Sequence, residues 1–270
     1  MAGACALAGA GTVLLACSSF GAADAPNATE GGVTEAGVTD GAVPDGLAAG
    51  GAAFCALHSS AVLCDDFDDP THNPWRDQSV DDAGTLAVSA GDASPPNALH
   101  VTMANLSTAG SGCHDSYEMS GQLDVAAPKG FHLEFKVLLL VGPLTGNVVI
   151  GPGVTLLGGA EKCEYYADIG LKPSALYEEH VTTATKKLDS MTVVKPGEWN
   201  TVSIDVAGTD TSRVVSLTIN GIVALDKKPV DLPCQTASTI DHLSVGLFCV
   251  ERSLGADVDV RFDDVLLTVP

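Results

Sequence analysis

The chain has 270 residues, of which 46% are hydrophobic and only 5% aromatic, and its 34 acidic and 13 basic side chains give a formal charge of −21. This length accommodates one large β domain or two small ones. The charge excludes a nucleic acid held on a basic surface, because such binding requires clustered Lys and Arg side chains. Cations and uncharged ligands such as glycans fit the charge. The apolar content also excludes global disorder.

The first 16 residues are small and apolar, and they lead into the tetrapeptide Leu14-Leu15-Ala16-Cys17. This tetrapeptide resembles the lipobox of a bacterial lipoprotein signal peptide. The resemblance implies cleavage before Cys17 and a lipid attached to that residue. Ser18 follows instead of an Asp retention signal, which indicates an exported lipoprotein of the outer membrane or cell surface. The usual basic segment of a signal peptide is missing, and the alternative is a buried helix rich in Ala and Gly.

Residues 17–54 form a predicted flexible linker between this anchor and a folded domain over residues 55–270. The linker contains the degenerate pentad of residues 32–46, in which each unit carries one acid and one Val. Such a composition cannot bury enough apolar area to offset its conformational entropy. We therefore expect an acidic tether that contacts the membrane only through the lipid.

Six of the eight cysteines lie in the predicted folded domain, since Cys5 falls in the signal and Cys17 is the lipid acceptor. An export signal and an even count predict up to three disulfides. Short loops close at the lowest entropic cost, which favours Cys55–Cys64 and Cys234–Cys249 and leaves Cys113 with Cys163. A zinc site is the alternative, but no pair has the required C-x-x-C spacing.

The domain is predicted to be all-β, because short apolar or alternating runs are separated by Gly, Pro, Asn and Asp, and no helix-length 3.6-residue period occurs. Asn220-Gly221 between two such runs predicts a two-residue type I′ hairpin. We expect strands at 62–67, 85–89, 98–103, 117–125, 131–141, 147–157, 164–171, 176–183, 188–194, 201–207, 214–219, 222–225, 240–249 and 257–269.

Four segments together resemble a known family. Residues 196–206 (PGEWNTVSIDV) and 215–221 (VSLTING) look like a hairpin of the concanavalin A-like lectin/glucanase jelly rolls, which include laminin-G-like domains. Residues 64–68 (CDDFD) and 260–266 (VRFDDVL) are similar to the first and last strands of its bacterial members. The resemblance implies a sandwich of two curved antiparallel sheets, with neighbouring first and last strands and a ligand on the concave face or its rim.

Acidic residues gather near these two terminal strands. Calcium prefers six to eight oxygen ligands of the carboxylate kind, and alternation along a strand allows only a subset of the acids to share a face. A structural calcium ion is one possibility, and solvated acids at strand ends are the other. The candidate metal ligands are Asp66, Asp68, Asp263 and Asp264.

A polar face on the middle strands is the candidate ligand site. Polar residues alternate there with apolar ones, and carboxylates with an aromatic ring suit the hydroxyls and flat faces of a glycan. Any solvent-facing sheet surface has the same pattern, so that interpretation stays open. The candidate glycan-binding residues are His132, Glu134, Glu164, Tyr166, Asp168 and Tyr177.

Catalysis has weaker support in the sequence. The E-x-D-x-x-E string of the glycoside hydrolase family 16 members of this fold is absent, and retaining chemistry needs two carboxylates. A lyase-like His and Tyr pair could be drawn from His114, Tyr117, His132 and Tyr166. We therefore expect a surface-anchored, non-catalytic jelly roll that binds carbohydrate or another cell-surface ligand. The alternatives are a polysaccharide-degrading hydrolase or lyase and a structural or adhesive envelope protein.

Overall fold

The computed structural model describes residues 52–69, 71–79, 84–90, 97–103, 113–141, 148–158, 161–168, 175–180, 185–190, 194–209, 211–251 and 257–270. The predicted signal peptide, the lipid acceptor Cys17 and nearly all of the predicted linker lie outside the described residues. No helix in the described ranges is both long and apolar enough to cross a membrane.

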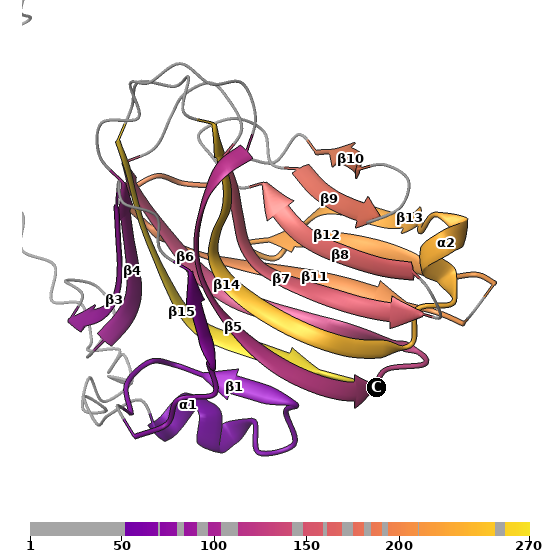
Figure 1. The fold of residues 1–270 in the computed structure, drawn as a ribbon, viewed down its shortest axis with the longest axis horizontal. Helices are drawn as coiled ribbons and strands as arrows, with labels where there is room; N and C mark the ends of the chain where they lie inside the picture. The colour runs from indigo at the N-terminus through magenta and orange to yellow at the C-terminus, as the bar shows by residue number, and fades with distance from the viewer. Residues whose placement is uncertain are drawn as a thin grey trace, which may run out of the picture. The chain divides into compact units, whose positions relative to one another are not determined.

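Two antiparallel sheets form the domain (Figure 1). Sheet A has the order β13-β12-β11-β6-β15-β4-β3, with β1 also paired to β15, and sheet B has the order β10-β9-β8-β7-β14-β5-β2. The strands are β1 Leu63–Asp65, β2 Asp77–Ser79, β3 Gly84–Ala90, β4 Asn97–Met103, β5 Cys113–Ala126, β6 Gly130–Val141, β7 Val148–Gly158, β8 Glu161–Asp168, β9 Ala175–His180, β10 Thr185–Asp189, β11 Trp199–Ala207, β12 Val214–Ile219, β13 Ile222–Pro229, β14 Thr239–Glu251 and β15 Val258–Thr268.

The prediction of an all-β sandwich is confirmed, and each predicted strand overlaps an observed one. The sequence missed β2 because its three residues, Asp77–Ser79, are all polar and too few to show an alternation. It also missed the helices α1 (Ala52–Leu57) and α2 (Leu232–Gln235). Helices of six and four residues are too short to show a 3.6-residue period.

Two local predictions hold in detail. Asn220 and Gly221 have φ angles of 52° and 74°, as the two central residues of a type I′ turn require. The first strand pairs with the last, since Leu63 lies opposite Leu267 and Asp65 opposite Val265. The ends of the domain therefore meet at one place in sheet A.

The disulfide pairing is partly wrong. Cys55 is bonded to Cys64 as expected, but Cys163 is bonded to Cys234 across a sequence separation of 71 residues. The loop-length argument failed because it ignores which side chains face the core. Cys163 points into the core from β8, and the loop that carries α2 brings the buried Cys234 to it. The other two cysteines belong to the neighbouring strands β5 and β14.

The core lies between the two sheets and is built from alternate residues of each strand. On β11, Val202, Ile204 and Val206 are buried as the alternation predicts. On β14 of the other sheet, the buried residues include Leu243, Val245 and Leu247. Because side chains alternate across a sheet, the residues between these face outward. The sequence therefore defines two outer surfaces, one for each sheet.

Candidate functional site

Two rows of outward-facing residues cross sheet B and define what we call the sheet B face. Cross-strand register aligns each row, and neighbouring strands lie about 4.8 Å apart. The first row contains Gln122 of β5, His242 of β14, Thr155 of β7 and Glu164 of β8. The second row contains Ser120, Ser244, Gly153 and Tyr166 of the same four strands.

The middle of this face has little side-chain bulk. Gly153 lies between Ser244 and Tyr166, and in the next row Gly246 of β14 lies opposite Gly151 of β7. Glycine lets a ligand approach the backbone closely. Larger side chains stand to either side, Glu164 and Tyr166 on β8 and Gln122 on β5. The geometry favours a flat, extended ligand laid across β7 and β14.

His242 is held by its neighbour Asp241. A register shift between Ile240 and His242 occurs in the pairing of β14 with both β5 and β7, and such bulges redirect side chains. The His242 Nδ1 atom donates to Asp241 Oδ2 at 2.5 Å, with the imidazole 37% exposed. Because an ionised carboxylate only accepts, the neutral ring has its proton on Nδ1 and a lone pair on Nε2. The Nε2 atom can therefore accept a proton.

The β8 side of the face supplies a paired acid and a phenol. Glu164 is bound to Lys162, with the two charged groups 2.6 Å apart, and it accepts a longer hydrogen bond of 3.4 Å from Thr155 Oγ1. Tyr166 is half-buried on the same face. A phenol both donates and accepts hydrogen bonds. Since β7 separates β8 from β14, the backbones of Tyr166 and His242 lie about 10 Å apart across the strands.

The structure does not bring the predicted glycan-binding residues to one groove. His132 and Glu134 belong to β6 of sheet A, whereas Glu164 and Tyr166 belong to β8 of sheet B. Alternation shows which face of its own strand a residue occupies, but not which sheet the strand joins. Of the other two predicted residues, Asp168 lies on β8 but is fully buried. Tyr177 lies on β9, with its backbone opposite that of Tyr166.

His132 instead forms an ion pair on the outside of sheet A. Its Nδ1 atom donates to Asp205 Oδ1 at 2.7 Å, and Glu134 lies 3.9 Å from Nε2. The hydrogen bond to Asp205 raises the pKa of His132, and the charge of Glu134 adds to this effect. The His132–Asp205 pair cannot act together with Tyr166, because His132 and Tyr166 lie on opposite outer faces of the sandwich.

The sequence reasoning missed His242 and Asp241. A signal was present, because His242 and Ser244 alternate with Leu243 and Val245 in a predicted strand. The pattern could not show that this strand lies in the centre of sheet B, between β7 and β5.

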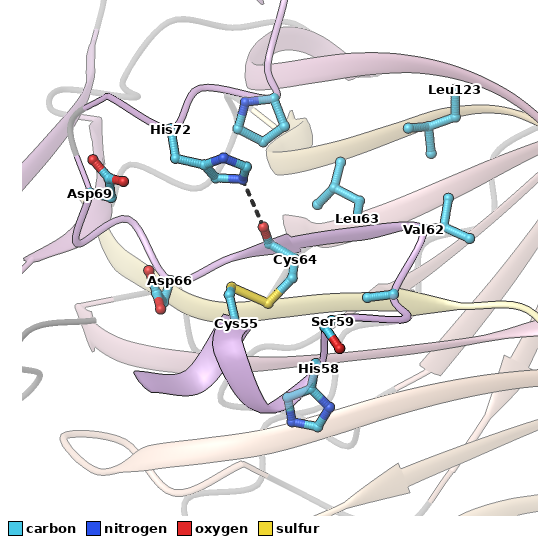
Figure 2. A pocket seen from close by; sticks show the side chains of 12 residues that line it. Cys55, His58, Ser59, Val62, Leu63, Cys64, Asp66, Asp69, His72 and Leu123 are labelled. Atoms are coloured by element: carbon cyan, nitrogen blue, oxygen red, sulfur yellow. Dashed lines mark hydrogen bonds between the residues drawn. A yellow bond between two sulfur atoms is a disulfide. The ribbon is translucent and has the colours of Figure 1, made fainter. Parts of the chain in front are cut away.

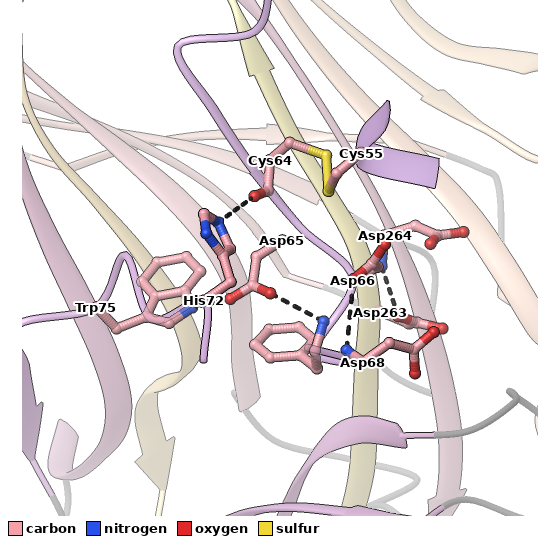
Figure 3. The surroundings of a disulfide bond; sticks show 10 residues. Cys55, Cys64, Asp65, Asp66, Asp68, His72, Trp75, Asp263 and Asp264 are labelled. Atoms are coloured by element: carbon pink, nitrogen blue, oxygen red, sulfur yellow. Dashed lines mark hydrogen bonds between the residues drawn. A yellow bond between two sulfur atoms is a disulfide. The ribbon is translucent and has the colours of Figure 1, made fainter. Parts of the chain in front are cut away.

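The acids at the first and last strands make contacts within the chain, and Figure 3 shows those between Asp66 and Asp68 and between Asp263 and Asp264. Asp68 accepts from the Asn97 amide at 2.8 Å, and Asp264 is paired with Lys136 at 2.5 Å. Asp66 accepts weakly from the Asp68 amide, and Asp263 accepts from the Asp264 amide. Within the described ranges, no group of three or more His, Cys, Asp and Glu side chains is arranged to hold a metal. A calcium ion bound by these acids therefore stays a prediction.

Two cavities flank the segment between β1 and β2. One, of about 420 Å³, lies beside the Cys55–Cys64 disulfide, and Asp66 and His72 are among its lining residues (Figure 2). The other, of about 340 Å³, contains Asp65. Asp65 accepts hydrogen bonds from the Trp75 indole at 2.5 Å and from the Phe67 amide at 2.9 Å, and burial raises its pKa. Asp65 is therefore part of the framework of this segment.

Comparisons with known proteins establish the fold. The endo-β-1,4-glucuronan lyase of the fungus Trichoderma reesei superposes with a TM-score of 0.58 at 12% identity, over 78% of this chain and 96% of that one. The alginate lyase vAL-1 from Chlorella virus gives 0.56 at 11% identity, over 78% and 100%. The family 7 alginate lyase A1-II′ gives 0.51 at 13% identity, over 71% and 93%. The domain is a concanavalin A-like jelly roll.

No protein-family model matches the sequence, and no curated protein is similar enough to count as a match. The structural comparisons nevertheless correct the expected function. A non-catalytic binding domain was the favoured interpretation of the sequence, but the three similar structures named above are lyases that act on glucuronan or alginate by their names. They favour the enzyme alternative instead.

Proposed function

We propose that the domain is a polysaccharide lyase whose active site is the sheet B face. The observation that carries this proposal is the Asp241-bound imidazole of His242, which faces outward beside a glycine-lined surface with Tyr166 beyond it. The named lyases with this fold support the reaction class. By their names, those enzymes act on glucuronan and alginate, which points to a polymer that contains uronic acid.

In the proposed reaction, His242 is the base and Tyr166 the acid. The Nε2 lone pair of His242 takes the proton at C5 of a uronic acid unit, and the released electron pair forms a C4=C5 double bond. The bond from C4 to the glycosidic oxygen breaks, and the Tyr166 hydroxyl protonates that oxygen. Asp241 positions the imidazole through its hydrogen bond to Nδ1. The products are an unsaturated uronate and a new reducing end.

A hydrolase is less consistent with the same face. Glycoside hydrolysis requires two carboxyl groups on either side of the bond, separated by about 5 to 9.5 Å. Glu164 is paired with Lys162, and Asp168 on the same strand has no exposed surface. Glu164 and Asp241, the partly exposed carboxylates described at this site, are therefore each held by a partner, Lys162 and His242 respectively. An acid and a base for elimination are both present.

The test is release of unsaturated products, followed by the ultraviolet absorbance of the new double bond. The purified chain is incubated with alginate, glucuronan and a neutral glucan as the control polymer. We expect activity on at least one uronate polymer and none on the glucan. His242→Ala and Tyr166→Phe should each lower kcat by about 10² to 10⁴-fold.

His132→Ala is the matched control, because His132 also has a carboxylate partner at Nδ1 but lies on sheet A. It should retain full activity. Equal losses in the His132 and His242 variants, or no product from any uronate polymer, would refute the assignment.

We further propose that the protein is exported and anchored through Cys17. The lipobox-like sequence supports this, as do the disulfides Cys55–Cys64 and Cys163–Cys234, because disulfides persist in oxidising compartments. Mass spectrometry of the N-terminal peptide from the native host tests it. A lipid-modified Cys17 is the expected result, and an unmodified peptide that retains residues 1–16 would contradict it.

A further inference from the structure

The cavity beside the Cys55–Cys64 disulfide lies apart from the sheet B face. It has a volume of about 420 Å³, which falls within the usual range of small-molecule sites. Leu63 and Leu123 contribute to its wall from the inward-facing sides of β1 and β5 (Figure 2). Gln122, by contrast, faces outward onto the sheet B face. The cavity and the proposed active site are therefore different surfaces.

The polar lining of this cavity is acidic. Asp66 and Asp69 both line it, and none of the described lining residues is a Lys or Arg. The side-chain and backbone donors of Thr71 lower the pKa of Asp69, so this carboxyl stays charged. His58 and His72 complete the ionisable lining. Such a lining repels uronates and attracts cations.

Asp66, one of the two lining acids, has a carboxylate oxygen without a hydrogen-bond donor. The residue is only 7% exposed, and its Oδ2 atom is buried without a hydrogen-bond partner. Its Oδ1 atom has one weak contact, 3.4 Å from the Asp68 amide. A buried carboxylate oxygen without a donor is costly, and a donor supplied by a ligand would remove that cost.

The rest of the cavity suits a compact ring. The disulfide and the apolar side chains of Val62, Leu63 and Leu123 provide a non-polar wall. On the other side, the His72 Nε2 atom donates to the Cys64 carbonyl at 3.0 Å and ties the 66–76 segment to β1 (Figure 2). The cavity thus combines a fixed apolar wall with a carboxylate that needs a donor.

We propose that this cavity binds a small ligand with a protonated amine, of the size and shape of an amino sugar. The ammonium group donates to Asp66 and is balanced by the charge of Asp69, while the ring packs against Leu63 and Leu123. A hydrogen bond between two charged groups is stronger than one to a hydroxyl. The site therefore selects an amine over a neutral sugar.

The probe is glucosamine, measured by calorimetric titration of the full chain. Glucose and N-acetylglucosamine are the matched neutral compounds, and calcium chloride is titrated separately. We expect glucosamine to bind at least about tenfold more tightly than either neutral sugar, because it alone forms the charge-assisted bond. Equal binding of glucose, calcium binding without amine binding, or no glucosamine binding at millimolar concentration would each overturn the proposal.

Asp66→Asn tests the residue itself, since it keeps the shape but removes the charge. It should weaken glucosamine binding about tenfold or more, and the ligand-free variant should be at least as stable as the parent. Asp226→Asn is the control, because Asp226 is an exposed acid on β13. An Asp66→Asn variant with unchanged affinity refutes the proposal. If that variant does not fold, Asp69→Asn takes its place with the same expectation.

Discussion

Removal of the Cys163–Cys234 disulfide should destabilise the domain more than removal of Cys55–Cys64. The sequence separations are 71 and 9 residues. The chain-entropy relation for cross-links then predicts a loss of about 4.4 kcal/mol for the longer loop and about 2.6 kcal/mol for the shorter one. Cys163 and Cys234 are also fully buried, whereas Cys55 and Cys64 are half-buried. Truncation to Ala therefore adds a cavity cost only in the first pair.

The measurement is urea unfolding of two double variants, Cys163→Ala with Cys234→Ala and Cys55→Ala with Cys64→Ala. The expected difference in unfolding free energy is about 2 kcal/mol or more, with the first pair the less stable. Comparable m-values for the two variants would show that their unfolding transitions can be compared. An equal loss in both, or the reverse order, would refute the argument from loop length and burial.

Two further predictions concern charged side chains. Arg213 is 1% exposed, and its guanidinium donates to the carbonyl oxygens of Pro128, Cys234 and Ala237; Arg213→Met should lower the unfolding free energy by about 3 kcal/mol or more. The exposed Arg76 provides the control variant Arg76→Met, which should change the unfolding free energy by less than about 0.5 kcal/mol. Denaturant unfolding measures both variants, and equal losses would contradict the role of the buried guanidinium. The pKa of His132 is raised in the folded state by Asp205, so its contribution to stability is present below the ordinary histidine pKa and is lost as pH rises through the folded value. The melting temperature of Asp205→Asn should therefore fall below that of the parent most strongly at acid pH, and a difference that is constant with pH would exclude this linkage.

Much of the fold could be predicted because it depends on local physics. A half-buried strand must alternate, and Val202, Ile204 and Val206 do so in the sequence and in the core. A two-residue turn with positive φ at both positions selects Asn220-Gly221. Acids near the two ends of the domain came together because β1 pairs with β15, as the resemblance to jelly rolls implied.

The candidate site was harder to predict, because it depends on which strands become neighbours. His132 and Tyr166 have the same local pattern, yet β6 joins sheet A and β8 joins sheet B. His242 gained its place beside Gly153 and Thr155 only through the pairing of β14 with β7.

The sequence by itself determined most of the described strands and the Asn220-Gly221 hairpin. Each of these follows from residues that are neighbours along the chain. The tertiary structure alone decided the Cys163–Cys234 bond, the burial of Asp168 and the outward position of His242. These depend on contacts between distant segments, and side-chain alternation carries no information about which strand lies alongside another.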